Sequence, residues 1–126
     1  MKRISTLAPF AIVLLFLAGC VTQRYMDPRV QFIDTTLPRD IIVTSVNTRI
    51  NDGGLLEMQM SARNDSYYDK NLEYRIEWLD NNGFEIKTIT TKWNRVFVNR
   101  HSDFRVLQVG PSEAAADFRI QIRYAR

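Results

Sequence analysis

Residues 72–78 alternate apolar and charged side chains, and this pattern restricts the fold more than any other feature of the chain. Successive side chains of a β-strand point to opposite faces, so the alternation predicts a strand with one buried face. The buried face would carry Leu72, Tyr74, Ile76 and Trp78. The cluster Asp80-Asn81-Asn82-Gly83 follows and leads into a second short strand at residues 84–87, which is a strong hairpin signal.

Similar strand patterns recur along the rest of the chain at intervals of about ten residues. Strands are expected at residues 41–50, 56–63, 93–98, 104–109 and 118–124, and a single helical turn at Ser112–Ala116. About seven strands without a long amphipathic helix predict an all-β fold, an Ig-like antiparallel β-sandwich with Trp78 on its third strand. A closed lipocalin-type barrel is the alternative, but its eight long strands need more residues than this segment offers.

The N-terminal segment has the order of a bacterial lipoprotein signal peptide. Lys2 and Arg3 precede an apolar run at residues 7–17, and the sequence Leu-Ala-Gly-Cys at residues 17–20 resembles a lipobox. The apolar run is shorter than the roughly 20 residues that a membrane-spanning helix needs. A plain secretory signal is the other alternative. We therefore expect cleavage between Gly19 and Cys20 and acylation of Cys20.

These motifs divide the chain into a signal peptide (1–19), a lipidated N-terminal tether (20–39) and the sandwich (40–126). Several acyl chains on Cys20 would hold the protein stably on a membrane. Val21, rather than Asp, follows the cysteine, which by resemblance to enterobacterial sorting favours the periplasmic face of the outer membrane. Disulfides are not expected, because Cys20 is the sole cysteine.

The charge of the chain does not favour a nucleic-acid partner. The whole sequence has 17 Lys and Arg against 14 Asp and Glu, and cleavage would remove Lys2 and Arg3, leaving 15 against 14. Nucleic-acid binding needs a clustered basic excess.

Neither a catalytic nor a metal site is expected. The sole histidine is His101, and in His101-Ser102-Asp103 the three side-chain types of a catalytic triad are adjacent, whereas a working triad is assembled from separate elements. The carboxylates are dispersed over alternating strand faces, unlike the ligands of a metal site. The sequence therefore predicts a protein that is not an enzyme and has no cofactor and no small-molecule substrate.

The stretch from Tyr74 to Gly83, with Asn64 before it and Trp93, Pro111 and Phe118 after it, resembles the YcfL-like family of proteobacterial periplasmic lipoproteins. The resemblance covers most of residues 40–126 and includes the lipobox. It implies an Ig-like sandwich in the cell envelope, encoded in some genomes beside activators of peptidoglycan synthesis. The family has no established activity.

We therefore expect a protein-binding or accessory module of the cell envelope. Tyr67 and Tyr68, adjacent in the polar loop 64–71, are the predicted partner contacts, since tyrosines are enriched at interfaces; alternatively they pack over the end of the sandwich. Asn64 is expected to bond to the backbone of this loop. Two other functions remain open: a structural or pilot lipoprotein of a larger envelope or secretion assembly, and a periplasmic hydrolase or sugar-binding module.

Overall fold

The computed structural model describes residues 26–89 and 91–126, so the expected signal peptide, Gly19 and Cys20 lie outside the described part. The elements in chain order are β1 (Val30–Phe32), α1 (Leu37–Asp40), β2 (Ile41–Ile50), β3 (Leu56–Asn64), β4 (Lys70–Leu79), β5 (Glu85–Ile86), β6 (Asn94–Val98), β7 (Ser102–Val109) and β8 (Asp117–Tyr124).

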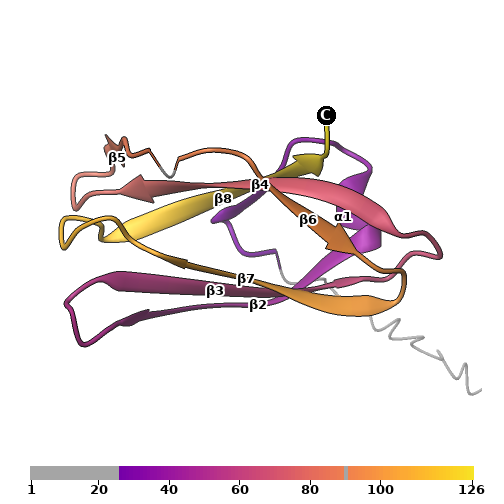
Figure 1. Cartoon of the computed structure of the whole chain (residues 1–126), viewed down its shortest axis with the longest axis horizontal. Helices are drawn as coiled ribbons and strands as arrows, with labels where there is room; N and C mark the ends of the chain where they lie inside the picture. The colour runs from indigo at the N-terminus through magenta and orange to yellow at the C-terminus, as the bar shows by residue number, and fades with distance from the viewer. Residues whose placement is uncertain (1–25, 90) are drawn as a thin grey trace, which may run out of the picture.

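Two β-sheets pack face to face as a sandwich (Figure 1). The larger sheet has five strands in the order β1-β8-β4-β5, and β6 pairs with the other half of β4. The smaller sheet has the order β2-β3-β7. All pairings are antiparallel except that of β1 with β8, which is parallel. The predicted β-sandwich is confirmed.

The alternating segment 72–78 forms the centre of the larger sheet. β4 pairs with both β8 and β6, so that Glu73 lies opposite Arg123 on one side and Arg95 on the other. Residues directly opposite each other share a face of the sheet. On the outer face, the charged residues of β4 therefore lie beside charged residues of β8 and β6.

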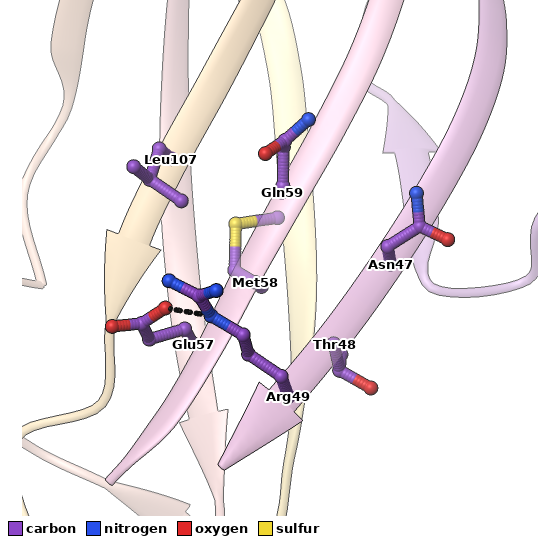
Figure 2. A pocket seen from close by; sticks show the side chains of 7 residues that line it. All are labelled: Asn47, Thr48, Arg49, Glu57, Met58, Gln59 and Leu107. Atoms are coloured by element: carbon purple, nitrogen blue, oxygen red, sulfur yellow. Dashed lines mark hydrogen bonds and ion pairs between the residues drawn. The ribbon is translucent and has the colours of Figure 1, made fainter. Parts of the chain in front are cut away.

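The smaller sheet has an apolar inner face and a polar outer face. Along β3, Leu56, Met58, Met60 and Ala62 are buried, while the residues between them are partly exposed. On the outer face, the guanidinium of Arg49 on β2 donates to Glu57 on β3 across a distance of 2.6 Å (Figure 2). The register of β2 shifts between Val43 and Ser45, which marks a β-bulge in this edge strand.

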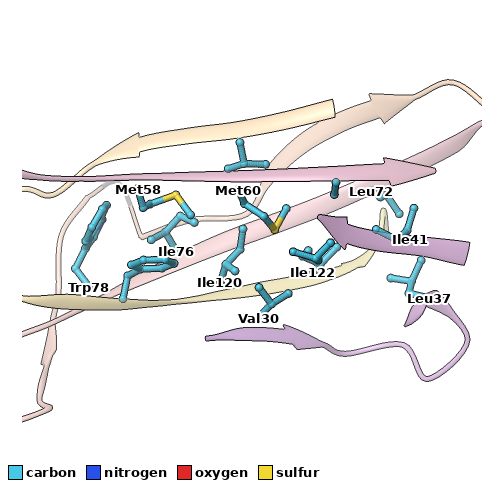
Figure 3. Close-up of a cluster of buried hydrophobic side chains, with 14 of the residues drawn as sticks. Val30, Leu37, Ile41, Met58, Met60, Leu72, Ile76, Trp78, Ile120 and Ile122 are labelled. Carbon is cyan, nitrogen blue, oxygen red and sulfur yellow. The ribbon is translucent and has the colours of Figure 1, made fainter. Parts of the chain in front are cut away.

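Side chains from both sheets fill the core between them (Figure 3). Trp78 is buried as predicted, and its ring centroid lies 6.1 Å from that of Phe118 on the neighbouring strand β8. Tyr74 is partly buried, and its hydroxyl accepts a hydrogen bond from Gln108 Nε2 at 3.3 Å. The apolar phase of β4 is thus confirmed as the inner phase of the sheet.

The expected boundary between tether and sandwich at residue 40 is wrong in this structure, because the folded domain begins earlier. β1 joins the larger sheet beside β8, with Val30 opposite Ile120. Val30 and Leu37 are both buried in the core. Asp27 is also buried, and its carboxylate accepts two hydrogen bonds from the Arg29 side chain. The sandwich therefore includes the chain from Asp27 onward.

Two local expectations also need correction. Residues 112–116 form a turn rather than a helical turn, in which the Ala115 backbone N–H donates to the Ser112 carbonyl oxygen at 3.2 Å. The strand expected at residues 84–87 is limited to Glu85–Ile86. The turn before it is confirmed, with Gly83 at φ 81°. No helix within residues 26–89 and 91–126 is long and apolar enough to cross a membrane.

Candidate functional site

Asn64 organises one end of the sandwich. It is the last residue of β3, falls on the inner phase of that strand and is fully buried. Its Nδ2 donates to the carbonyl oxygens of Tyr68 at 2.8 Å and Asn99 at 3.2 Å. Its Oδ1 accepts from the Ser66 backbone N–H at 3.1 Å and from Ser66 Oγ at 2.7 Å. One buried amide therefore holds two loops, residues 65–69 and residues 99–101, as the sequence predicted for the first of them.

Residues 65–69, named here the tyrosine loop, present two aromatic rings to solvent. Tyr67 is 76% exposed and Tyr68 is 75% exposed. The alternative in which these rings pack over the end of the sandwich is therefore wrong. The rings of Tyr67 and His101 form an edge-to-face contact, with centroids 4.8 Å apart and ring planes at 88°. His101, at φ 50°, belongs to the second loop that Asn64 holds.

Hydrogen bonds and ion pairs hold the base of the tyrosine loop. Asp69 Oδ1 accepts the Arg100 backbone N–H at 2.8 Å, a second link between the two loops. Lys70 Nζ lies 3.2 Å from Asp40 Oδ2. Burial raises the pKa of Asp40, but hydrogen bonds from Arg39 and Lys70 outweigh this effect and leave the pKa below its usual value. The base of the loop is thus fixed while its rings stay exposed.

The side chains of His101, Ser102 and Asp103 turn to different partners. His101 contacts Tyr67, Ser102 Oγ donates to the Arg100 carbonyl oxygen, and Asp103 Oδ1 accepts from Arg63 Nη1 at 3.4 Å. Across the residues that the structure describes, no group of three or more His, Cys, Asp or Glu side chains is placed to hold a metal ion.

The outer face of the smaller sheet carries a shallow groove of about 190 Å³ (Figure 2). Its lining comes from all three strands, namely Asn47, Thr48, Arg49, Glu57, Met58, Gln59 and Leu107. The hydrogen bonds from Arg49 and Asn51 keep the pKa of Glu57 below its usual value. Pockets for small molecules are usually about 300–1,000 Å³. This groove is smaller. It could not be predicted from the sequence, because strand register brings its residues together.

The outer face of the larger sheet carries a cluster that the sequence analysis did not predict. Glu73 is buried there beneath two arginines, with Oε2 accepting from Arg123 Nε at 2.9 Å and Oε1 from Arg95 Nε at 3.3 Å. The guanidinium carbon of Arg123 lies 3.7 Å from the Trp93 ring centroid, and that of Arg75 lies 5.2 Å from it. Such cation–π contacts are strongest with tryptophan.

We name this cluster the arginine face, defined by Arg75, Arg95, Arg119 and Arg123 with Trp93, Glu73 and Glu77. Arg75 Nη2 donates to Glu77 at 2.9 Å and to Gln121 at 2.6 Å. The alternating patterns of β4 and β8 indicate which of their residues lie on the outer face. The register of β6, which places Arg95 opposite Glu73, does not follow from these patterns.

These observations define a class of protein: a small two-layer β-sandwich with an exposed aromatic loop and an arginine-rich sheet face. The chain belongs to the family described as "Protein of unknown function (DUF1425)", which matches residues 29–124. The match begins before residue 40, as does the folded domain. No curated protein matches this chain.

Two solved structures share the fold. The crystal structure of Campylobacter jejuni cj0090 matches with a TM-score of 0.69 and 24% identity, over 79% of this chain and 100% of that chain. A crystal structure of a DUF1425 family member from Shewanella sp. pv-4 matches with a TM-score of 0.62 and 22% identity, over 68% of this chain and 79% of that chain.

Proposed function

We propose that this protein is a lipid-anchored, non-enzymatic binding module of the bacterial cell envelope, and that the tyrosine loop contacts its protein partner. The observation that carries the proposal is the exposure of Tyr67 and Tyr68 on a loop whose base is fixed by the buried Asn64. A loop already held in place loses little conformational entropy on binding. Tyrosine is also among the residues that contribute most to the energy of protein interfaces.

The anchor in this proposal is Cys20, and the setting is the periplasmic face of the outer membrane. The lipobox-like sequence at residues 17–20 and Val21 support both. The proposed link to peptidoglycan synthesis rests on the resemblance to the YcfL-like family.

The early start of the folded domain shortens the tether. Only residues 21–26 separate an acylated Cys20 from the buried Asp27. At about 3.3–3.6 Å per residue, this segment reaches roughly 25 Å when fully extended. We therefore propose a partner that lies close to the membrane surface.

Affinity capture from detergent-solubilised membranes tests the binding role. We expect Tyr67→Ser with Tyr68→Ser to lose the partner, since truncating an interface hot-spot residue costs about 2 kcal/mol or more, roughly a thirtyfold weaker complex. Phe84→Ser is the matched control, because Phe84 is an exposed aromatic residue in a different turn, 71% exposed. Equal capture by the double variant and the control would show that the binding surface lies elsewhere.

The same capture separates the binding role from the alternatives. A stoichiometric multi-subunit complex that survives the double substitution would favour a structural subunit of an envelope assembly. Copurifying glycan would favour a sugar-binding module.

Intact mass spectrometry tests the anchor. The mature wild-type protein should exceed the mass of residues 20–126 by about three acyl chains and a glycerol unit, as for a typical bacterial lipoprotein. Cys20→Ser should not acquire the thioether-linked lipid. An unmodified Cys20 thiol in membrane-derived protein would contradict the anchor.

A further inference from the structure

Strand β7 is an edge of the smaller sheet and has an open side. It pairs with β3 in one continuous register from Ser102 to Val109, and no described strand pairs with its other side. Natural sheets usually protect their edges with short strands, bulges, prolines, lysines or a covering segment. β7 has eight residues, no bulge, and neither proline nor lysine. Its outward backbone groups are therefore open to a further strand.

The other edges of the sandwich are shorter or interrupted. In the larger sheet, β1 has three residues, β5 has two and β6 has five. In the smaller sheet, the opposite edge strand β2 contains the bulge between Val43 and Ser45. The guanidinium of Arg29 also donates to the Val46 carbonyl oxygen of β2 at 3.5 Å. Among the described strands, β7 is thus the longest uninterrupted edge.

The hydrogen-bonding pattern of β7 identifies the residues whose backbone faces outward. The Gly110 N–H donates to the Leu56 carbonyl oxygen at 2.7 Å, one position beyond the β3–β7 register. Hydrogen-bonded and non-hydrogen-bonded pairs alternate along an antiparallel ladder. The backbone groups of Arg105, Leu107 and Val109 therefore point away from β3, toward the open edge.

The side chains of the same three residues are exposed on the outer face of the sheet. Leu107 is 60% exposed and Val109 is 43% exposed. Figure 2 shows Leu107 beside Gln59 of β3, its partner in the register. Arg105 is exposed and makes no ion pair with any described residue. Since opposite residues of neighbouring strands interact, this edge matches a strand with two apolar residues followed by an acidic one at alternate positions.

We propose that β7 binds an extended segment of the protein partner as an additional antiparallel strand, an inference that deepens the binding role proposed above and rests on it. Such strand addition draws affinity from main-chain hydrogen bonds and specificity from alternate side chains. β7 begins at Ser102, next to His101, whose ring contacts Tyr67. An added strand that continues past Ser102 therefore reaches the tyrosine loop, and one partner contacts both surfaces.

A second copy of this chain fits the edge less well. In the two-fold antiparallel register that pairs all the outward-facing residues, Arg105 lies opposite Leu107 of the second copy, and Asp103 lies opposite its Val109. The register that pairs Asp103 with Arg105 in both directions leaves Leu107 and Val109 beyond the paired segment. No register of β7 with itself matches the charges and the apolar residues together, so the occupant is a different chain.

Amide hydrogen exchange on the full mature protein in detergent micelles, read by NMR, tests the proposal. The probe is the end-blocked peptide Val-Thr-Leu-Thr-Glu-Thr, whose valine, leucine and glutamate would lie opposite Val109, Leu107 and Arg105. We expect exchange at the Leu107 and Val109 N–H groups to slow several-fold, and exchange at Thr48, exposed on the β2 edge, to stay unchanged. The same peptide N-methylated at leucine and glutamate should give no protection, because it lacks the main-chain donors.

Unchanged exchange along β7, or equal protection by the methylated peptide, would overturn the strand addition. Protection of Leu107 that appears without peptide as the protein concentration rises would also overturn it, in favour of a second copy.

A charge reversal tests the acidic residue of the partner strand. Arg105→Glu should weaken protection by the peptide up to about fivefold, the size of a cross-strand charge pair, and a peptide with lysine in place of glutamate should restore it. Arg119→Glu, at an exposed arginine on the other sheet, should change neither result. Equal protection of wild type and Arg105→Glu by both peptides would overturn the pairing of Arg105 with an acid.

The exchange and capture experiments separate this inference from the tyrosine contact. The six-residue peptide ends opposite Phe104 and does not reach the tyrosine loop. Protection of β7 together with normal capture by the Tyr67→Ser, Tyr68→Ser variant would overturn the tyrosine contact and leave the strand addition standing. Lost capture by that variant without protection of β7 in the wild type would do the reverse.

Discussion

Asn64 Nδ2 lies 2.8 Å from the carbonyl oxygen of Tyr68, and this hydrogen bond connects the inner end of β3 to the exposed tip of the tyrosine loop. The same nitrogen lies 3.4 Å from the Val98 carbonyl oxygen at the end of β6, on the other sheet. A buried polar side chain needs hydrogen-bond partners, and here most of the partners are backbone groups of two loops and of the end of β6, with Ser66 Oγ in addition. The arrangement couples the stability of the core to the presentation of Tyr67 and Tyr68.

Asn64→Ala should therefore destabilise the domain as well as loosen the loop. The substitution leaves buried backbone carbonyls and Ser66 Oγ without their partner, at about 1–3 kcal/mol for each unsatisfied group. We expect a loss of about 2–4 kcal/mol in urea denaturation and faster amide exchange at residues 66–68. Asn71→Ala, an exposed asparagine on β4, should change stability by less than about 0.5 kcal/mol. Similar losses in both variants would contradict the role of Asn64.

Trp78→Ala should be among the most damaging substitutions in the core. Trp78 is buried between the sheets against Phe118, and replacing a buried tryptophan by alanine costs about 3–5 kcal/mol. For a domain of about 100 residues, that corresponds to a fall in melting temperature of more than ten degrees. Phe97→Ala, at a residue 59% exposed on β6, is the control and should melt close to wild type. An unchanged melting curve for Trp78→Ala would contradict burial of the indole.

The sequence allowed β4, Trp78 and the Gly83 turn to be predicted because their signals are local. Period-2 alternation and turn chemistry depend on a few adjacent residues. The pairing of β1 with the sandwich could not be predicted in the same way, since three residues are too few to show a period and the partner of Val30, Ile120, is ninety residues away. Tyr67 and Tyr68 were placed in a loop correctly, but their exposure depends on bonds from Asn64 to a second loop.

The arginine face illustrates the same limit. Glu73 stands on the charged phase of β4, on the outer face of the sheet, yet it is buried. Its burial depends on Arg95 and Arg123, which come from strands on either side. Which side chains cover it follows from strand register, a non-local property that one sequence does not reveal.

Gly83→Ala should destabilise the hairpin between β4 and β5. Gly83 has φ 81°, and a left-handed backbone costs a residue with a Cβ about 1–2 kcal/mol. A Cβ at this position would meet no atom within 4 Å, so the expected loss is conformational rather than steric. Thermal melting should show this loss for Gly83→Ala and a smaller one for Gly83→Asn, because asparagine tolerates this conformation better. Equal losses for the two variants would point to a different cause.

Acid titration should identify Glu73 as a contributor to stability at neutral pH. Burial raises the pKa of Glu73, but the hydrogen bonds from Arg123, the Arg126 backbone and Arg95 outweigh it, so the pKa in the folded protein lies below the usual 4.5. Between the folded and the usual pKa, the unfolded chain binds more protons than the folded one. The stabilisation is therefore fully present above about pH 4.5 and is lost as the pH falls through the lowered folded pKa.

Glu73→Gln removes this titration and also the charge that faces two arginines. We expect the variant to unfold at lower urea concentration than wild type at pH 7, and its stability to decline less as the pH falls below about 4.5, so that the two proteins converge in acid. Urea midpoints measured from pH 7 to pH 3 test this. Glu85→Gln, at an exposed carboxylate on β5 with no ion pair to a described residue, serves as the control and should follow the wild-type profile. Parallel acid profiles for Glu73→Gln and wild type would show that the pKa of Glu73 is not lowered by its arginine partners.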